Sequence, residues 1–191
     1  MKVIGFTGNY GKEDSVPQAY LMADSSILYT GRTFFVPDYA QRFVATPSIV
    51  VRMGRLGKCV APKFAHRYWD AFAAAFTIRS CDSDDDRLKG LDRAIDGAAI
   101  VGDWISVSNA SDAMHTPIEA RVGDKVVAQC CLADMRYPLE ELIAAVSTRC
   151  SIKMGDLLFT GDAGEGCVLS PGEHLSACIG GQQVLDMKVK L

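Results

Sequence analysis

The chain has 191 residues, 49% hydrophobic and 23% charged, which is enough to bury a substantial core within one domain spanning residues 1–191. Its formal net charge of −3 argues against nucleic acid as a main partner, because phosphate binding needs a basic surface. No run approaches the roughly 20 apolar residues of a membrane span, and the N-terminus lacks a signal-peptide core, so we expect a cytoplasmic protein without a membrane partner.

Strand-like runs dominate the first half of the chain. MKVIGFTG predicts an opening strand, and similar runs follow at 19–29 and 31–39. SIVVRMG is short, apolar and β-branched, so it predicts a strand with Thr46-Pro47-Ser48 at its entrance, where a missing N–H does least harm. FAHRYWDAFAAAFTI predicts a helix over 64–75, because its apolar residues fall on one helical stripe: Phe64, Tyr68, Ala71, Phe72 and Ala75.

The second half combines strands with one further helix. The runs at 98–107, 118–132 and 176–191 predict strands, the last two with glycine-centred hairpin turns. PLEELIAAVSTRC predicts a helix over 138–148, because a proline followed by acidic residues suits a helix N-terminus. CDSDDDRLKG lacks the glycine and the distal Glu of a calcium loop and predicts a solvated acidic loop. The pattern predicts a mostly β fold with short helices (α+β).

The seven cysteines do not indicate a metal or redox site. Their number is odd, their spacings are irregular, and no CxxC occurs. No histidine stands at ligand spacing from any of them, so we interpret them as reduced thiols in core and half-buried positions.

Residues 138–190 resemble the C-terminal signature of the fumarylacetoacetate hydrolase family. The shared features are a short helix, the strand GDLLFTG, a glycine loop, a PGE turn and a closing hairpin. Upstream, GNY, FFVPDYAQR, VVRMGRLGK, FAHRY and DGAAIVGDW fall in the family's order and spacing. The resemblance covers nearly the whole chain and implies a mixed β-roll of packed sheets and a homodimer.

The resemblance also implies a metal position, which this chain has altered. The family holds Mg²⁺ or Mn²⁺ with three carboxylates, and counting from the shared motifs places them at Thr46, Ser48 and Thr77. An alignment with a single gap would instead place the third position at Cys81 or Asp82. Three neutral hydroxyls do not replace the lost negative charge, so we expect no Mg²⁺ or Mn²⁺ and no other cofactor.

The family's catalytic residues are replaced as well. Its lysine falls on Arg93, with Lys89 as the competing candidate; arginine keeps the charge but cannot act as a base. The histidine and glutamate of the family's lid fall on Glu13 and Val16, which leaves Glu13 as a weak catalytic candidate. The loop after the TG begins with Asp162, where the family has Thr-Pro.

Several family residues are retained and are candidates for ligand binding beside Arg93: Asn9, Tyr10, Gln129, Thr160 and Gly161. Each has a structural alternative as a turn or scaffold residue. Arg93 itself has the alternative of pairing with the acidic loop at 82–86.

Two functional classes follow. The first is a pseudoenzyme or scaffolding homologue that keeps a pocket for a small carboxylate or oxo-acid, with Arg93 as the cation. The second is a metal-independent or altered hydrolase, isomerase or decarboxylase acting on small oxo-acids, with an enolate stabilised by preorganised donors. The altered metal ligands, base and lid favour the first class.

Overall fold

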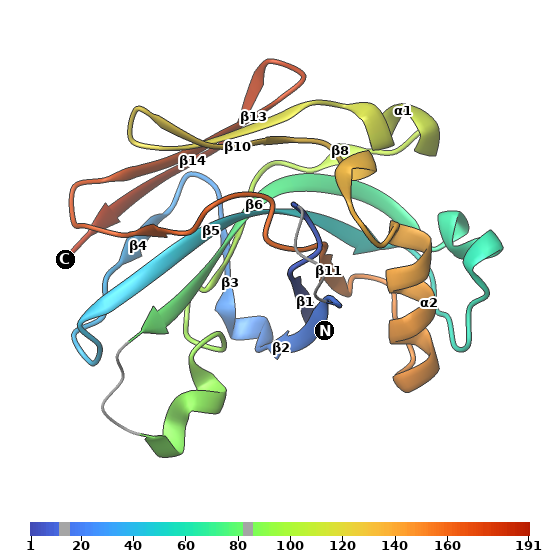
Figure 1. Cartoon of the computed structure of the whole chain (residues 1–191), viewed down its shortest axis with the longest axis horizontal. Coiled ribbons are helices and arrows are strands. Elements are labelled where there is room, and N and C mark those ends of the chain that lie inside the picture. The colour runs from blue at the N-terminus through green and yellow to red at the C-terminus, as the bar shows by residue number, and fades with distance from the viewer. Residues whose placement is uncertain (12–15, 82–85) are drawn as a thin grey trace.

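The computed structural model describes residues 1–11, 16–81 and 86–191, and strands form most of it. A nine-stranded mixed sheet has the order β2-β1-β11-β5-β6-β7-β3, with β12 added beside β5 and β8 beside β6 (Figure 1). Its strands are β1 (Val3–Thr7), β2 (Gln18–Met22), β3 (Ile27–Tyr29), β5 (Arg42–Met53), β6 (Trp69–Cys81), β7 (Ala99–Val101), β8 (Ile105–Ser106), β11 (Leu157–Phe159) and β12 (Cys167–Val168).

A five-stranded sheet packs on the first, in the order β10-β9-β13-β14-β4. Its strands are β4 (Thr33–Phe35), β9 (Ile118–Val122), β10 (Lys125–Cys130), β13 (His174–Ile179) and β14 (Gln182–Lys190). The α-helices are α1 (Ala110–His115) and α2 (Leu139–Arg149), and 3₁₀ turns occupy Asp24–Ser26, Pro62–Arg67, Asp86–Leu91 and Leu132–Asp134. The mostly β fold, the helix over 138–148 and both glycine-centred hairpins are confirmed. No helix in the described ranges is long and apolar enough to cross a membrane.

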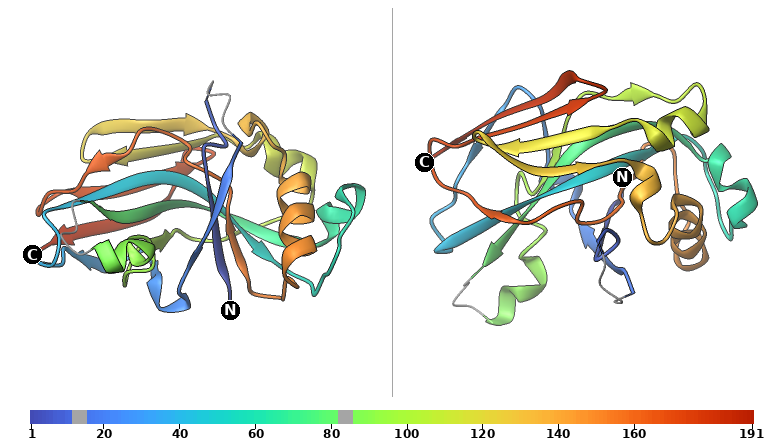
Figure 2. Two further views of the ribbon diagram at one scale, coloured as in Figure 1. Left: turned by 60° about the horizontal axis from the view of Figure 1, so that its bottom comes forward. Right: turned by 45° about the horizontal axis from the view of Figure 1, so that its top comes forward.

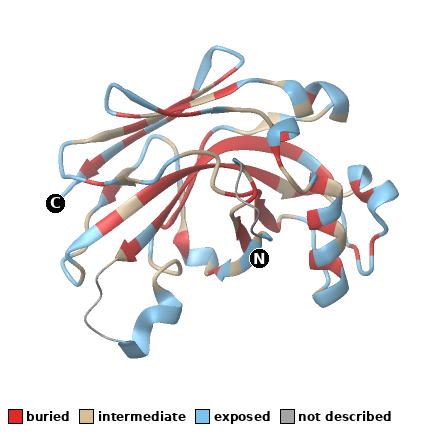
Figure 3. Ribbon diagram, viewed as in Figure 1, coloured by how far each residue is buried: buried red, intermediate tan, exposed pale blue. Residues whose placement is uncertain are grey.

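Alternate residues of β5 and β6 divide between two cores, because successive side chains of a strand point to opposite faces. Ile49, Val51 and Phe72 face the five-stranded sheet and α2, and belong to the larger core. On the inner face, β1, β2 and β3 turn back below β5 and β6 (Figures 1 and 2). Val50 and Ala73 belong to the smaller core enclosed there. The buried residues accordingly follow the centre of both sheets (Figure 3).

The helix expected over 64–75 is wrong. A 3₁₀ turn covers Pro62–Arg67, and the chain then enters the thirteen-residue strand β6. β6 lies between β5 and β7 and is buried on both faces, so its sequence AFAAAFTI is continuously apolar rather than alternating. Such a run imitates a helical stripe, and periodicity alone does not separate the two.

The expectation that Thr46-Pro47-Ser48 stands at the entrance of a strand is wrong as well. These residues lie in the middle of β5. β5 pairs with β12 at Val44 and Ala45 and with β11 only from Val50 onward. Between these partners the Pro47 carbonyl accepts a hydrogen bond from the Ala163 N–H at 2.9 Å. Pro47 therefore lies in a gap between the two partner strands. Its lack of an N–H costs no hydrogen bond of the sheet there.

Candidate functional site

Three hydroxyls meet on the inner face of the curled sheet. Thr46 on β5 lies directly opposite Thr77 on β6, and Ser48 is the next inward residue of β5. All three are buried. Cys81 instead lies opposite Arg42, four residues or about 13 Å further along β6. The register thus brings together the three positions implied by the gapless count, while Asp82 lies outside the described residues.

Tyr20 fills the space beside these hydroxyls. It pairs with Gly5 across β1 and β2, and a Cβ on Gly5 would lie 2.2 Å from Cζ of the phenol ring. The hydroxyls of Tyr20 and Thr77 are buried, and neither has a hydrogen-bond partner within the described part of the chain. Burial raises the pKa of Tyr20, while Arg93 and Thr77 near its hydroxyl oppose that shift. The Tyr20 and Thr77 hydroxyls therefore lie near each other on the inner face, and neither makes a hydrogen bond of good geometry to another described residue.

Arg93 lies over Tyr20 at the opening of the inner face, which we call the mouth of the roll and define by Tyr20, Arg79 and Arg93. Its guanidinium carbon stands 4.4 Å from the centroid of the phenol ring, a cation–π contact worth roughly 0.5–2 kcal/mol. A pocket of about 410 Å³ opens here, and Tyr20, Arg79 and Arg93 are among its lining residues. Lys89 also lines it but is exposed and pairs with Asp86 at 2.5 Å. Arg93 therefore contacts Tyr20, whose hydroxyl lies near Thr77, whereas Lys89 pairs at the surface.

The alternative in which Arg93 pairs with the acidic loop is only partly described. Asp86 pairs with Lys89, and the rest of that loop lies outside the described residues. Glu13, the weak catalytic candidate, lies outside them too.

Asp162 adds a carboxyl to the same mouth. Burial raises its pKa, against the opposing effects of Arg93, the Gly8 N–H and Arg79. It directly follows Gly161, whose carbonyl accepts a hydrogen bond from the Ser48 hydroxyl at 2.7 Å. A half-buried carboxyl with a perturbed pKa beside an arginine is typical of a functional site.

We expect Asp162→Asn to stabilise the fold at pH 7 by a few degrees in Tm, the response of a domain this size to ~1 kcal/mol. Because the folded-state pKa of Asp162 is raised above 3.8, its contribution to stability is present below that value and is lost as the pH rises through the folded-state pKa. The Tm difference between Asp162→Asn and wild type should therefore grow from pH 3.5 to 7. Parallel curves would contradict the assignment.

A hydrogen-bond network connects the N-terminal segment to the residues that follow β11. It is built around Asn9, Tyr10, Thr160 and Gly161. The Asn9 amide donates to the carbonyls of Thr160 at 2.9 Å and Tyr137 at 3.1 Å. The Thr160 hydroxyl bonds the Tyr10 hydroxyl and the Ile49 carbonyl, each at 2.9 Å. Burial raises the pKa of Tyr10 strongly. These polar groups are engaged within the protein, and their ligand-binding role stays a prediction.

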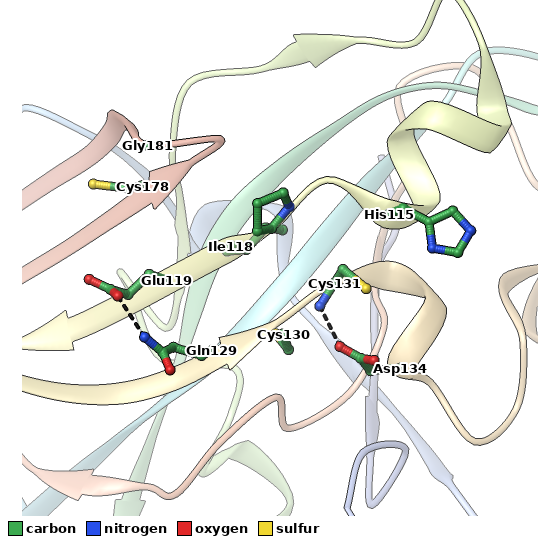
Figure 4. Close-up of a pocket in the computed structure, with 10 residues that line it drawn as sticks. His115, Ile118, Glu119, Gln129, Cys130, Cys131, Asp134, Cys178 and Gly181 are labelled. Atoms are coloured by element: carbon green, nitrogen blue, oxygen red, sulfur yellow. Dashed lines mark hydrogen bonds between the residues drawn. The ribbon is translucent and has the colours of Figure 1, made fainter.

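Gln129 lies in a different pocket. It is exposed on β10, and its amide donates to the Glu119 carboxylate at 2.8 Å. The pocket of about 550 Å³ around it is also lined by His115 and Asp134 (Figure 4). The Asp134 carboxylate accepts from the Cys131 N–H at 2.7 Å and is occupied as a cap. The structure therefore does not bring Gln129 together with Arg93.

The residues at the implied metal position do not fit Mg²⁺ or Mn²⁺. Thr46, Ser48 and Thr77 offer neutral hydroxyls, whereas hard cations require anionic oxygen ligands. The guanidinium of Arg93 adds positive charge over the ring of Tyr20, whose hydroxyl lies near Thr77. Within the described ranges, no group of three or more His, Cys, Asp or Glu side chains is placed to hold a metal ion.

Comparison with known sequences identifies the fold's family. The family model described as Fumarylacetoacetate (FAA) hydrolase C-terminal matches residues 7–190. The chain belongs to the fumarylacetoacetate hydrolase family. No curated protein sequence matches it.

Solved structures of this family superpose closely at low sequence identity. The 5-carboxymethyl-2-hydroxymuconate delta-isomerase from Mycobacterium smegmatis has a TM-score of 0.86 at 18% identity, over 99% of this chain and 78% of that one. The fumarylpyruvate hydrolase from Pseudomonas aeruginosa, in complex with Mn²⁺ and pyruvate, has 0.87 at 17% identity, over 100% and 90%. The 2-hydroxyhepta-2,4-diene-1,7-dioate isomerase from Mycobacterium marinum has 0.85 at 19% identity, over 99% and 74%. The likeness confirms the fumarylacetoacetate hydrolase fold.

Sequence reasoning missed Tyr20 and Arg79 and did not use Asp162 as a site residue. Tyr20 sits in an apolar run, where it resembles an ordinary strand residue. The departure from Thr-Pro at Asp162 was a usable signal, because a carboxyl introduced next to a retained glycine turn changes the charge of the site.

Proposed function

We propose that this member of the fumarylacetoacetate hydrolase family binds a small carboxylate at the mouth of its roll without a divalent metal, with Arg93 as the anchoring cation. It then acts as a pseudoenzyme or as a binding and scaffolding homologue. The observation that carries the proposal is the position of Arg93, which lines the mouth pocket and stands over the ring of Tyr20. The Tyr20 hydroxyl in turn lies near Thr77, one of the three altered metal positions.

The chemistry of the pocket supports an anionic ligand. Arg93 and Arg79 both line it, and a planar guanidinium can hold a carboxylate through two parallel hydrogen bonds. Asp92, an acidic residue of the lining, accepts a hydrogen bond from the Ser80 hydroxyl at 3.2 Å. No salt bridge to Arg93 occurs within the described part of the chain, and its charge acts through space on Asp162 and on the Tyr20 hydroxyl.

Thermal unfolding with increasing pyruvate, in the presence of EDTA, tests the proposal. Pyruvate is chosen because it occupies the related Pseudomonas hydrolase. A ligand at 100 times its Kd stabilises the folded state by about 2.7 kcal/mol. Acetamide, which is uncharged, should give no shift. The absence of any shift with pyruvate, or an equal shift with acetamide, would refute the proposal.

Asp162 favours a second candidate, metal-independent keto–enol chemistry on an oxo-acid. A carboxyl with a raised pKa beside Arg93 is a candidate general base. The same pyruvate samples in D₂O distinguish the two functions: catalysed loss of the methyl proton signal indicates an enzyme, and binding without exchange indicates a pseudoenzyme.

The homodimer implied by the family resemblance remains part of this proposal. β2 forms an open edge of the nine-stranded sheet, and the Leu21 side chain on it is 66% exposed. An uncharged, exposed edge strand favours pairing with another chain. We expect a dimeric mass by light scattering at micromolar concentration, and a monomeric mass would contradict the proposal.

A further inference from the structure

Two surface segments far apart in sequence run side by side next to α2. Gly57 and Ile152 exchange backbone hydrogen bonds at 3.0 and 2.9 Å, and the Cys59 N–H donates to the Ser147 carbonyl at 3.0 Å. The 3₁₀ turn Pro62–Arg67 then packs beside α2 (Figure 1). We call residues 54–69 and 147–155 together the basic loop surface.

The basic loop surface carries positive charge only. It contains six of the chain's 20 Lys and Arg residues, all exposed, and no Asp or Glu: Arg55, Lys58, Lys63, Arg67, Arg149 and Lys153. The acidic residues immediately after its two segments are already engaged, Asp70 with Arg52 at 2.8 Å and Asp156 with Lys2 at 2.5 Å. The concentration of charge contrasts with the net charge of −3 of the whole chain.

Large apolar side chains project from the same surface. Leu56 is 72% exposed and Met154 is 77% exposed. Leu56 directly precedes the bridge residue Gly57, and Met154 lies in the turn that the Asp156 N–H closes on the Lys153 carbonyl at 3.0 Å. Phe64, on the 3₁₀ turn Pro62–Arg67, is 42% exposed. Apolar tips interleaved with cations are the pattern of surfaces that enter the headgroup region of a membrane.

We propose that the basic loop surface docks this protein peripherally on a membrane containing anionic phospholipid. Cations attract the negatively charged headgroups, and Leu56 and Met154 enter the boundary with the acyl chains. Nucleic acid is disfavoured because bases stack on free aromatic faces, whereas Lys63 and Arg67 each stand 5.0 Å from the centroid of the Phe64 ring. The proposal departs from the expectation of no membrane partner, which rested on the lack of a membrane span and of a signal-peptide core.

Co-sedimentation with vesicles tests the proposal on the full chain. We expect binding to vesicles of phosphatidylcholine with 30% phosphatidylserine and little binding to phosphatidylcholine alone. Added salt should weaken the binding, because exposed charges are screened beyond ~10 Å at 0.1 M ionic strength. The triple variant Arg55→Glu/Lys63→Glu/Lys153→Glu should bind at least about 100-fold more weakly. The matched control Lys125→Glu/Lys188→Glu/Lys190→Glu changes the net charge equally on the five-stranded sheet and should keep most of the affinity.

A second variant separates insertion from charge attraction. Leu56→Ser/Met154→Ser leaves every cation in place and should weaken vesicle binding about tenfold. Circular dichroism should show the wild-type fold in each variant. The proposal is overturned if wild type ignores anionic vesicles, if both triple variants lose binding equally, or if the serine variant binds as wild type does. Displacement of the protein from vesicles by a 20-nucleotide DNA, added so that its phosphate charge equals that of the phosphatidylserine, would assign the surface to nucleic acid instead.

Discussion

Arg93→Ala is expected to weaken pyruvate binding at least about 100-fold, so that the stabilisation by pyruvate disappears over the concentrations that stabilise wild type. The guanidinium is half-buried at the mouth of the roll, where a charge-assisted, two-point hydrogen bond to a carboxylate is stronger than on an open surface. Arg93→Lys keeps the charge but loses the planar fork, so it should bind with intermediate affinity.

The ligand-induced shift in Tm, and not the absolute Tm, is the quantity to compare for Arg93. Removing the guanidinium also removes its contact with the Tyr20 ring, which lowers the stability of the unliganded variant by roughly 0.5–2 kcal/mol. Lys89→Ala is the matched control, because Lys89 lines the same pocket but pairs with Asp86 at the surface. Equal pyruvate shifts in wild type and Arg93→Ala would remove Arg93 from the binding site.

Asp156→Asn is expected to lower the free energy of unfolding by about 1–3 kcal/mol, the cost of leaving hydrogen-bond donors without their charged acceptor. Only 1% of Asp156 is exposed, at the entrance to β11. Its carboxylate accepts the Lys2 ammonium at 2.5 Å, the Lys2 N–H at 2.7 Å and the Lys153 N–H at 2.8 Å. The variant leaves the Lys2 ammonium without its charged partner, while the backbone pairing of β1 with β11 remains.

The pH dependence of stability gives the same residue a second test. Burial alone would raise the pKa of Asp156, but the hydrogen bonds from Lys2 and Lys153 outweigh burial and lower it. The stability from Asp156 is therefore present above its unfolded pKa of about 3.8 and is lost as the pH falls through the lower folded-state pKa. Urea unfolding between pH 7 and 3 should show this loss in wild type and in Asp124→Asn, an exposed control. A variant as stable as wild type at pH 7 would contradict the assignment.

The sequence determined those features that depend on neighbouring residues. The hairpins at 118–132 and 176–191 need only alternating strands around a glycine turn, and α2 needs only its proline start and its apolar face. The ordered family motifs then indicated the architecture, which the match over 7–190 confirms. The same count indicated that Thr46, Ser48 and Thr77 belong together, because the family motif carries tertiary information that spacing alone lacks.

Only the tertiary structure decided what surrounds those hydroxyls. β6 is a strand because β5 and β7 hydrogen bond to it on both sides, and this pairing overrides the helical stripe in its sequence. Tyr20, Arg93 and Asp162 are distant along the chain and meet because the sheet curls and closes its inner face. Gln129 faces outward on the other sheet for the same reason: pairing register and sheet curvature, neither of which local sequence encodes, decide which side chains share a pocket.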